Sequence, residues 1–308
     1  MYQILTDEDI KFLKIESVVN GIEQSLRARS EGALIAPPRF SVKVERGALV
    51  FTAGAETKHS HSIGFRVYDT FPKSSEDHVQ IVAVFDSQTG DFRGLVIGQL
   101  IGALRTAALN AVAIKYMARS DVQNLGILGS GFQARFHMQA AMEVRQFRNA
   151  KVYSPTASHC EEFAAEMSAQ IGLRVEAARS ADEVVRFADV LICATTSTSP
   201  VLESSWIKSG THINTIGPKF KGMSEIPYEL AQLSQVIATD SPEQANSYPE
   251  PFFLAHTPEG NRMVDLSEIV VGKQKGRLSS ADITLFCSVG LAGTEVAVAN
   301  EALKLAPR

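Results

Sequence analysis

A glycine-rich turn stands at residues 126–134, where the chain reads Gly-Ile-Leu-Gly-Ser-Gly-Phe-Gln-Ala. Gly129, Gly131 and Ala134 fit the Gly-x-Gly-x-x-Ala fingerprint of dinucleotide-binding units. The first glycine permits a tight turn, the second lets a pyrophosphate approach the backbone, and the alanine lets the following helix pack closely. The N-terminus of that helix offers N–H groups to phosphates. We therefore predict dinucleotide contacts from Gly129, Ser130, Gly131, Phe132, Gln133 and Ala134.

The choice between NAD(H) and NADP(H) depends on the end of the next apolar run. An acidic residue there would bind the ribose 2′-hydroxyl of NAD. The chain instead has Ser154, followed by Thr156, Ser158 and His159, which can donate hydrogen bonds to a 2′-phosphate. No arginine accompanies them to clamp the phosphate. The sequence thus favours NADP(H) without excluding NAD(H).

The elements around this turn alternate between strand and helix. Short apolar runs occupy 125–131, 150–156, 188–196, 211–217 and 234–240, and helix-like segments occupy 134–147 and 158–172. Such alternation predicts βαβ units around a parallel sheet.

The earlier part of the chain has a different pattern. Residues 47–54, 61–71 and 78–98 alternate in hydrophobicity between turn residues, which predicts antiparallel strands and hairpins. A first helix is expected through Ile15–Leu26, with Thr6 and Asp9 as its start, and an Ala-rich helix at 100–119. The helical run at 288–306 is expected to pack back on this first domain. The predicted fold class is α/β, with a Rossmann domain at 116–289 and a second α+β domain at 1–115 and 290–308.

Composition excludes several functions. The 30 Lys and Arg against 34 Asp and Glu give a net charge of −4, so no basic surplus favours nucleic acid. No apolar run approaches the ~20 residues of a membrane span, and the acidic, amphipathic start resembles neither a signal nor a transit peptide. Three scattered cysteines suggest no disulfides and a reducing cytoplasm. The pair His59 and His61 has no third ligand nearby, so we expect no metal site.

Several further motifs occur in a characteristic order. They are Pro37-Pro38-Arg39, Arg105-Thr106-Ala107-Ala108, the glycine turn, Ala194-Thr195-Thr196, Trp206–Asn214, Asp282–Phe286 and Ser288–Leu291. In order and spacing the chain resembles the ornithine cyclodeaminase/mu-crystallin family nearly from end to end. The resemblance implies a Rossmann domain that binds NAD(H) or NADP(H), and a second domain that carries substrate residues and forms a homodimer through its sheet. It also implies hydride transfer at the α-carbon of an amino or imino acid.

The resemblance assigns roles to individual residues. Arg39 and Arg105 match the family's carboxylate-binding arginines, and guanidinium groups suit that task because they bind carboxylates in bidentate fashion. Arg66 stands where the family has a pocket lysine, and Lys219 stands where ornithine cyclodeaminases have an aspartate. Arg66 and Lys219 are therefore candidate catalytic residues, with Arg66 also a substrate ligand. The nicotinamide is expected over the strand end at Thr195 and Thr196.

These departures bear on the substrate. Three or four cations around one pocket would repel the two ammonium groups of ornithine and favour an anionic keto or imino acid. The leading hypothesis is an imine or ketimine reductase or an amino-acid dehydrogenase. One alternative is an ornithine cyclodeaminase, which would need a carboxylate elsewhere, such as Glu56, Asp69 or Glu225. Another is a non-catalytic, crystallin-like protein that binds NADP(H). The sequence leaves open whether Lys219 faces the pocket or the solvent.

Overall fold

The computed structural model describes residues 2–72 and 79–306, so His78, at the start of one predicted strand run, lies outside the described residues. The chain forms two compact units, Met1–Ala108 with Gly290–Arg308 and Leu109–Val289. The division falls inside helix α2 (Leu100–Met117), ahead of the expected boundary at 115/116. An Ala-rich helix without an internal proline was predicted here, and it is confirmed.

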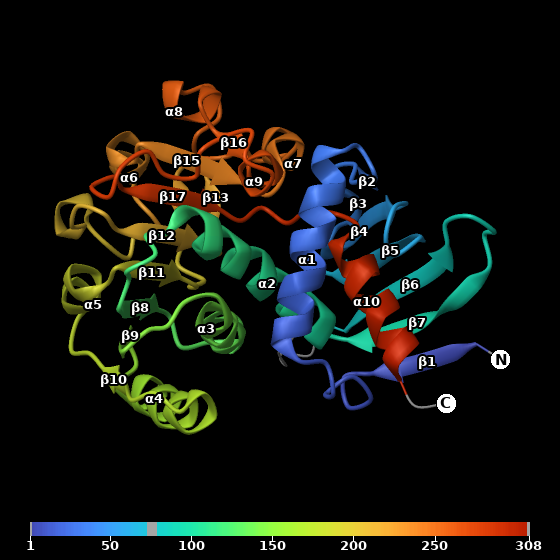
Figure 1. Ribbon diagram of the computed structural model, residues 1–308, viewed down its shortest axis with the longest axis horizontal. Helices are drawn as coiled ribbons and strands as arrows, with labels where there is room; N and C mark the ends of the chain where they lie inside the picture. Colours follow the sequence, from blue (N-terminus) through green and yellow to red (C-terminus); the bar gives the residue numbers. More distant parts are fainter. Residues whose placement is uncertain (1, 73–78, 307–308) are drawn as a thin grey trace. The chain divides into compact units, whose positions relative to one another are not determined.

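The first unit is built on one sheet with the strand order β1-β7-β6-β5-β4-β2, and β3 also pairs with β4. All pairings are antiparallel except that of β1 with β7. Helices α1 (Ile15–Ser30) and α10 (Thr294–Leu305) contact each other, and α10 lies against β4–β7 (Figure 1). The strands are β1 (Gln3–Thr6), β2 (Leu34–Ile35), β3 (Phe40–Val44), β4 (Gly47–Glu56), β5 (Ser62–Asp69), β6 (Gln80–Asp86) and β7 (Phe92–Gly98).

The predicted strands and the return of the C-terminal helix are confirmed, but the start predicted for the first helix is wrong. Asp9 accepts hydrogen bonds from the backbone N–H and the hydroxyl of Thr6, both at 2.8 Å, and so closes a turn after β1. Helix α1 begins at Ile15, with Lys14 as its N-cap residue. A hydrogen bond between side chain and backbone three residues apart occurs both at helix starts and in isolated turns. The Thr6–Asp9 pattern therefore did not identify the start of the helix.

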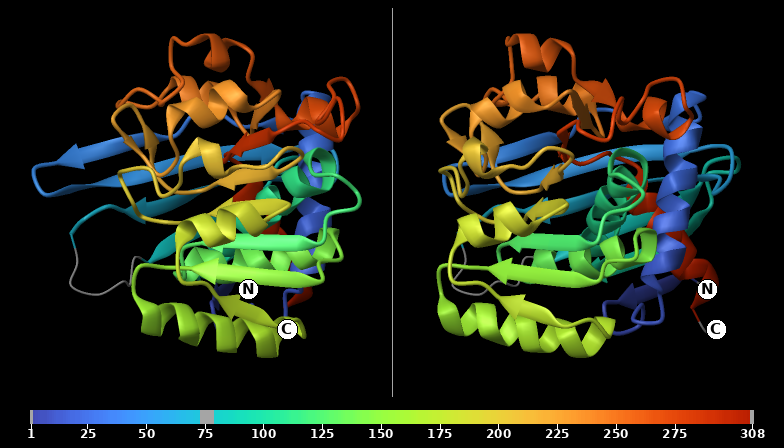
Figure 2. Two further views of the ribbon diagram at one scale, coloured as in Figure 1. Left: turned by 90° about the vertical axis from the view of Figure 1, so that its left-hand side faces the viewer. Right: turned by 60° about the vertical axis from the view of Figure 1, so that its left-hand side comes forward.

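The second unit is built on an eight-stranded parallel sheet with the order β10-β9-β8-β11-β12-β17-β15-β16 (Figure 2). The chain order reverses between β8 and β11, and at such a switch point parallel sheets bind ligands beyond the carboxyl ends of their strands. The strands are β8 (Asn124–Leu128), β9 (Asn149–Tyr153), β10 (Val175–Ala177), β11 (Val190–Cys193), β12 (His212–Thr215), β15 (Val236–Thr239), β16 (Val264–Asp265) and β17 (Thr284–Cys287), with a separate hairpin of β13 (Lys219–Phe220) and β14 (Met223–Ser224).

Helices cover both faces of the parallel sheet. Helices α3 and α4 pack on one face around Ile127 and Phe163, and α5 and α6 pack on the other around Leu191 and Ile213. This arrangement confirms the predicted Rossmann fold. The helices are α3 (Phe132–Val144), α4 (Ala157–Ile171), α5 (Ala181–Phe187), α6 (Tyr228–Leu233), α7 (Pro242–Asn246), α8 (Pro258–Asn261) and α9 (Leu266–Val270), with a 3₁₀ turn η1 (Ser204–Trp206).

Strand β17 is one of several elements that sequence reasoning missed, with β1, β3 and β10 among the others. It is completely buried between β12 and β15, and the helical run expected around 288–306 begins only at Thr294. Four residues without alternating polarity carry too little periodicity to mark a strand. Among the described residues, no helix is long and apolar enough to cross a membrane.

Candidate functional site

The structure brings together the three arginines that sequence reasoning singled out in the first unit. Arg66 points from β5 to the buried face of the sheet, whereas its neighbours Ile63 and Phe65 point to the exposed face. Arg105 comes from α2 and Arg39 from the segment before β3. Their common neighbourhood includes two residues that sequence reasoning did not select, Glu295 and Tyr68.

Glu295 is the counter-ion of this cluster. Its Oε1 accepts a hydrogen bond from Arg66 Nη1 at 2.9 Å and lies 3.1 Å from Arg105 Nη2. Glu295 is 1 % exposed, although it occupies the first turn of α10 in an otherwise apolar run. An acid on the buried face of a helix was the sequence signal that could have found it, because such a charge needs a partner.

Tyr68 joins two of the arginines. Its hydroxyl accepts a hydrogen bond from Arg39 Nη1 at 3.2 Å, and the Arg66 guanidinium lies 4.3 Å from its ring centroid. Residues two apart on a strand share a face, so the position of Tyr68 after Arg66 was readable from the sequence. Together these contacts fix the planes of two guanidinium groups.

Burial and the neighbouring charges shift the pKa values of Arg66 and Glu295. Burial lowers the pKa of Arg66 to about 10, with Arg105 and Arg39 acting in the same direction and Glu295 opposing them. For Glu295, burial by itself raises the pKa, but Arg105 and Arg66 bring it below its ordinary value. Arg66 therefore remains a cation near neutral pH and Glu295 an anion. Three guanidinium groups and one carboxylate leave a formal charge of +2.

The cluster has unpaired donors for an anionic ligand. Among the described residues, Arg66 Nε and both Nε and Nη1 of Arg105 are buried without a hydrogen-bond partner. Gly290, with a φ of +91°, borders the cluster, and a Cβ there would lie 2.7 Å from Arg39 Nη2. A side chain at position 290 would thus enter the space beside the guanidinium groups. These features suit a carboxylate.

The glycine turn of the second unit has the geometry that its fingerprint predicts. Gly129 has a φ of +106°, and a Cβ there would lie 2.4 Å from the carbonyl oxygen of Ala194. Gly131 is the N-cap residue of α3 without a side-chain cap, and a Cβ there would meet open space. Ala134 is fully buried in the helix–sheet core. The turn therefore leaves the N-terminus of α3 open to a pyrophosphate.

The neighbouring candidates flank this turn. Ser130 accepts a hydrogen bond from Arg135 through its carbonyl oxygen at 2.9 Å, Phe132 is 44 % exposed, and Gln133 Oε1 is buried without a partner among the described residues. Ser154 follows β9 and Thr156 precedes α4, one strand from the turn. Thr195 and Thr196 follow β11, on the other side of the turn. The residues present fit a dinucleotide across the switch point.

Lys219 lies in the second unit and does not face solvent. It is 6 % exposed in β13, and its Nζ donates a hydrogen bond to the carbonyl oxygen of Gly217 at 2.5 Å. The carboxylates named as substitutes for a catalytic aspartate have local partners. Glu56 accepts backbone N–H groups of the loop 58–60, and Asp69 accepts that of Phe71 at 3.2 Å. Glu225 accepts hydrogen bonds from Thr195, Thr215, Ile216 and Gly217.

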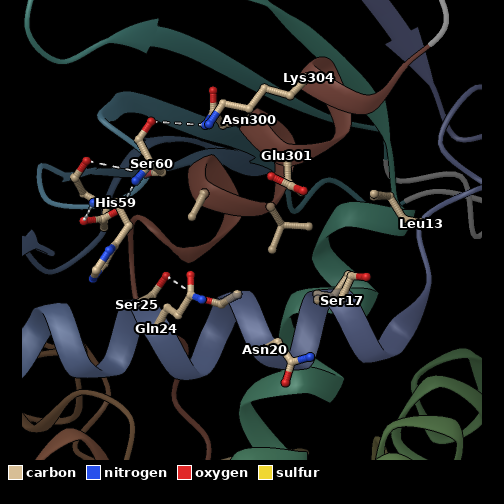
Figure 3. Close-up of a pocket in the computed structure, with 15 residues that line it drawn as sticks. Leu13, Ser17, Asn20, Gln24, Ser25, His59, Ser60, Asn300, Glu301 and Lys304 are labelled. Carbon is tan, nitrogen blue, oxygen red and sulfur yellow. Dashed lines mark hydrogen bonds between the residues drawn. The ribbon is translucent and has the colours of Figure 1, made fainter.

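A groove of about 330 Å³ lies in the first unit between α1, α10 and the loop after β4 (Figure 3). Its lining includes Gln24, His59 and Glu301 but none of the three clustered arginines. The described residues contain no group of three or more His, Cys, Asp or Glu side chains arranged to hold a metal ion.

Comparison with known proteins places this geometry in context. Residues 3–303 match the model of the ornithine cyclodeaminase/mu-crystallin family. Iminosuccinate reductase of Paracoccus denitrificans is 33 % identical over 232 residues, which cover 75 % of this chain and 71 % of that protein. The Thermococcus litoralis Δ1-pyrroline-2-carboxylate reductase, solved with NADH and L-proline, superposes with a TM-score of 0.90 at 32 % identity, covering 98 % of this chain and 96 % of that one.

An archaeal alanine dehydrogenase dimer with bound NAD has a TM-score of 0.88 at 26 % identity and covers 98 % of this chain and 95 % of its own. These matches confirm the prediction of an enzyme that uses NAD(P)(H) to oxidise or reduce an amino or imino acid. The match to the family model spans both units described above. The chain belongs to the ornithine cyclodeaminase/mu-crystallin family.

Proposed function

We propose that this protein reduces the C=N bond of an anionic imino acid with NAD(P)H, or catalyses the reverse amino-acid oxidation. The observation that carries the proposal is the cluster of buried Arg66 and Arg105 with half-buried Arg39, which keeps a formal charge of +2 in spite of Glu295. A buried excess of positive charge with unpaired N–H groups favours a carboxylate ligand. The named activities of its relatives on iminosuccinate, pyrroline-2-carboxylate and alanine support the same substrate class.

Each candidate residue then has a role. Arg39, Arg66 and Arg105 bind and orient the substrate carboxylate, and the N-terminus of α3 with Ser154 and Thr156 binds the cofactor. The bound nicotinamide supplies or accepts the hydride. Lys219 is the candidate proton donor, because it is buried and has an ammonium group at the carboxyl edge of the parallel sheet.

Glu295 modifies the electrostatic argument made from the sequence. It neutralises one of the clustered cations, so the repulsion of a diamine is weaker than three bare arginines would give. Two ammonium groups still meet a net positive cluster. An anionic imino acid is therefore preferred over ornithine, and a dicarboxylate such as iminosuccinate is included in the proposed class.

The first unit is proposed to bind substrate and form a homodimer, and the second unit to bind NAD(P)(H). The outer face of the first sheet supports self-association, because large exposed patches of this kind mark interfaces. The dimeric alanine dehydrogenase is consistent with this proposal. The exposed apolar side chains of the first sheet include Phe40, Val42, Val44, Leu49, Ile63, Phe65 and Ile81.

We place the protein in the cytoplasm, since its three cysteines are free and buried.

The test is a substrate panel. Purified protein is incubated with NADH or NADPH and with Δ1-pyrroline-2-carboxylate, iminosuccinate, or pyruvate plus ammonia, and oxidation of the cofactor is followed by absorbance. Turnover of at least one anionic imine is expected. Tight cofactor binding without turnover of any of them would contradict the proposal and favour a non-catalytic binding protein.

A further inference from the structure

Glu225 is a fully buried acid in the second unit whose carboxylate collects five hydrogen bonds. Its Oε2 accepts the backbone N–H of Thr195 at 2.9 Å and the Thr195 hydroxyl at 2.8 Å. Its Oε1 accepts the Thr215 hydroxyl at 2.6 Å and the N–H groups of Ile216 and Gly217 at 3.0 and 2.6 Å. All five groups are donors at these contacts, so the site requires a side chain that only accepts.

The backbone of Glu225 is also held by hydrogen bonds. The backbone N–H of Glu225 donates to Pro218 at 3.0 Å, and its carbonyl oxygen accepts from Val201 at 2.9 Å. Gly217 packs directly on it, since a Cβ at position 217 would lie 2.5 Å from Glu225 Oε2. The absence of a side chain at Gly217 therefore leaves the space that the carboxylate occupies.

The bonded groups lie at the functional edge of the parallel sheet. Thr195 follows β11, and Thr215–Gly217 end and follow β12, so Glu225 ties the carboxyl ends of two neighbouring strands. The carbonyl oxygen of Gly217 also accepts the hydrogen bond from Lys219 Nζ. One carboxylate thus bonds Thr195 directly and is linked to Lys219 through the backbone of Gly217.

We infer that Glu225 is a positioning residue for the nicotinamide half of the cofactor, a role that rests on the proposed function. The N–H groups of Thr195 and Gly217 lie just beyond the strand ends and donate to Glu225, whereas the N–H of Ile216 is shared between Glu225 and the carbonyl oxygen of Cys193. Thr195 is thereby held in one conformation beside Gly129, which lies against the preceding residue, Ala194. In the described part of the chain, none of the hydrogen bonds of Glu225 goes to the pyrophosphate turn, so we expect the two halves of the cofactor to depend on different residues.

The experiment uses Glu225→Gln. A glutamine oxygen can keep the three donors at Oε1, but its amide nitrogen then meets the N–H of Thr195 as a second donor. The Thr195 hydroxyl can accept from this amide, so the substitution selectively removes the acceptor of the Thr195 backbone N–H. Binding of NAD(P)H is measured by its fluorescence, and binding of ADP-ribose or its 2′-phosphate, which lack nicotinamide, by calorimetry. We expect the affinity for NAD(P)H to fall on the order of tenfold, the loss of one hydrogen bond to a charged group, with ADP-ribose unchanged.

Two companion variants keep the result interpretable. Thr195→Val removes the hydroxyl that donates to Glu225 Oε2. It should cause a smaller loss of affinity, and for NAD(P)H alone. Thr215→Val removes a bond to Oε1 alone and should leave the preference for NAD(P)H over ADP-ribose as in the native protein. If Glu225→Gln does not fold, the contrast between these two threonine variants decides the question.

Three outcomes are separable. Equal weakening of NAD(P)H and ADP-ribose in Glu225→Gln would show a purely structural role and overturn the inference. Unchanged binding of both would also overturn it, while leaving the proposed function intact. Failure of the native protein to bind NAD(P)H at all would contradict the proposed function itself.

Discussion

Arg66 and Glu295 form a buried ion pair, with Nη1 and Oε1 2.9 Å apart and side chains 8 % and 2 % exposed. They come from β5 and α10, elements far apart in the sequence that pack together in the first unit. Arg105 shares the same carboxylate oxygen. The pair therefore links the substrate cluster to the stability of the unit that holds it.

Replacing Glu295 by Gln should destabilise the protein strongly. Arg66 and Arg105 would remain buried without their carboxylate, and breaking a buried pair costs about 3–5 kcal/mol. Urea unfolding gives the free energy of unfolding directly. Glu8→Gln is the control, because Glu8 pairs with Lys11 at an exposed site and should change that free energy by less than about 1 kcal/mol. Similar losses in the two variants would argue against the role of Glu295.

Replacing Arg39 or Arg105 by Leu should weaken substrate binding and leave cofactor affinity unchanged. Each loses a charge-assisted contact to the substrate carboxylate, at about 1.5–3 kcal/mol. Steady-state kinetics with a responsive imino acid, together with cofactor titration, measure both effects. Arg46→Leu, an exposed arginine in the same unit, is the matched control. An unchanged KM and kcat in either cluster variant would place that arginine outside the substrate site.

Ser154→Asp should lower the affinity for NADPH and spare that for NADH. A carboxylate at the end of β9 repels a 2′-phosphate and can accept a hydrogen bond from a 2′-hydroxyl. For the native protein we expect NADPH to bind at least as well as NADH. Fluorescence titration of NADPH and NADH with the native protein and with Ser154→Asp tests both expectations. A clear native preference for NADH would refute the assignment of Ser154.

Acid should destabilise the second unit through His212. Burial, and then the charge of Arg277, lower the pKa of this histidine from 6.5 to about 3, and its Nδ1 lies 2.8 Å from the Thr284 hydroxyl. The unfolded chain takes up this proton below pH 6.5 while the folded chain does not. Stability therefore falls as the pH drops from 6.5 towards 3, by roughly 2–3 kcal/mol at about pH 4.5.

The contribution of His212 is isolated with His212→Gln, which cannot take up the proton. Chemical unfolding at a series of pH values should give a shallower loss for this variant between pH 6.5 and 3. Parallel curves for the native protein and the variant would assign the acid sensitivity to other groups, such as Glu295, whose lowered pKa acts further into the acid range.

Ornithine should be a poor substrate. Its two ammonium groups meet the net positive cluster of Arg39, Arg66 and Arg105, and Lys219 cannot accept a proton while it is charged. Incubation with ornithine and catalytic NAD or NADP should yield little proline. Proline formation at ordinary enzymatic rates, on the order of 1–1000 per second, would restore the cyclodeaminase alternative. Anionic imino acids serve as the positive control.

Features that depend on short spacings were readable from the amino-acid sequence. The glycine turn at 129–134, the alternation of apolar runs and helices in the second unit, and the antiparallel strands of the first were all predicted from local periodicity and turn residues. These patterns are readable because backbone conformation and side-chain direction repeat over a few residues. The family motifs likewise identified Arg39, Arg66 and Arg105 as residues of one cluster.

The pairing of buried charges was not readable from the sequence and depends on the folded chain. Arg66 and Glu295 are 229 positions apart, and Thr195 and Glu225 are 30 apart with several elements between them, so no local period relates either pair. Strand β17 likewise takes its place between β12 and β15 by pairing with distant strands. A buried carboxylate is tolerated only where donors from separate elements converge on it, and that convergence exists only once the chain has folded.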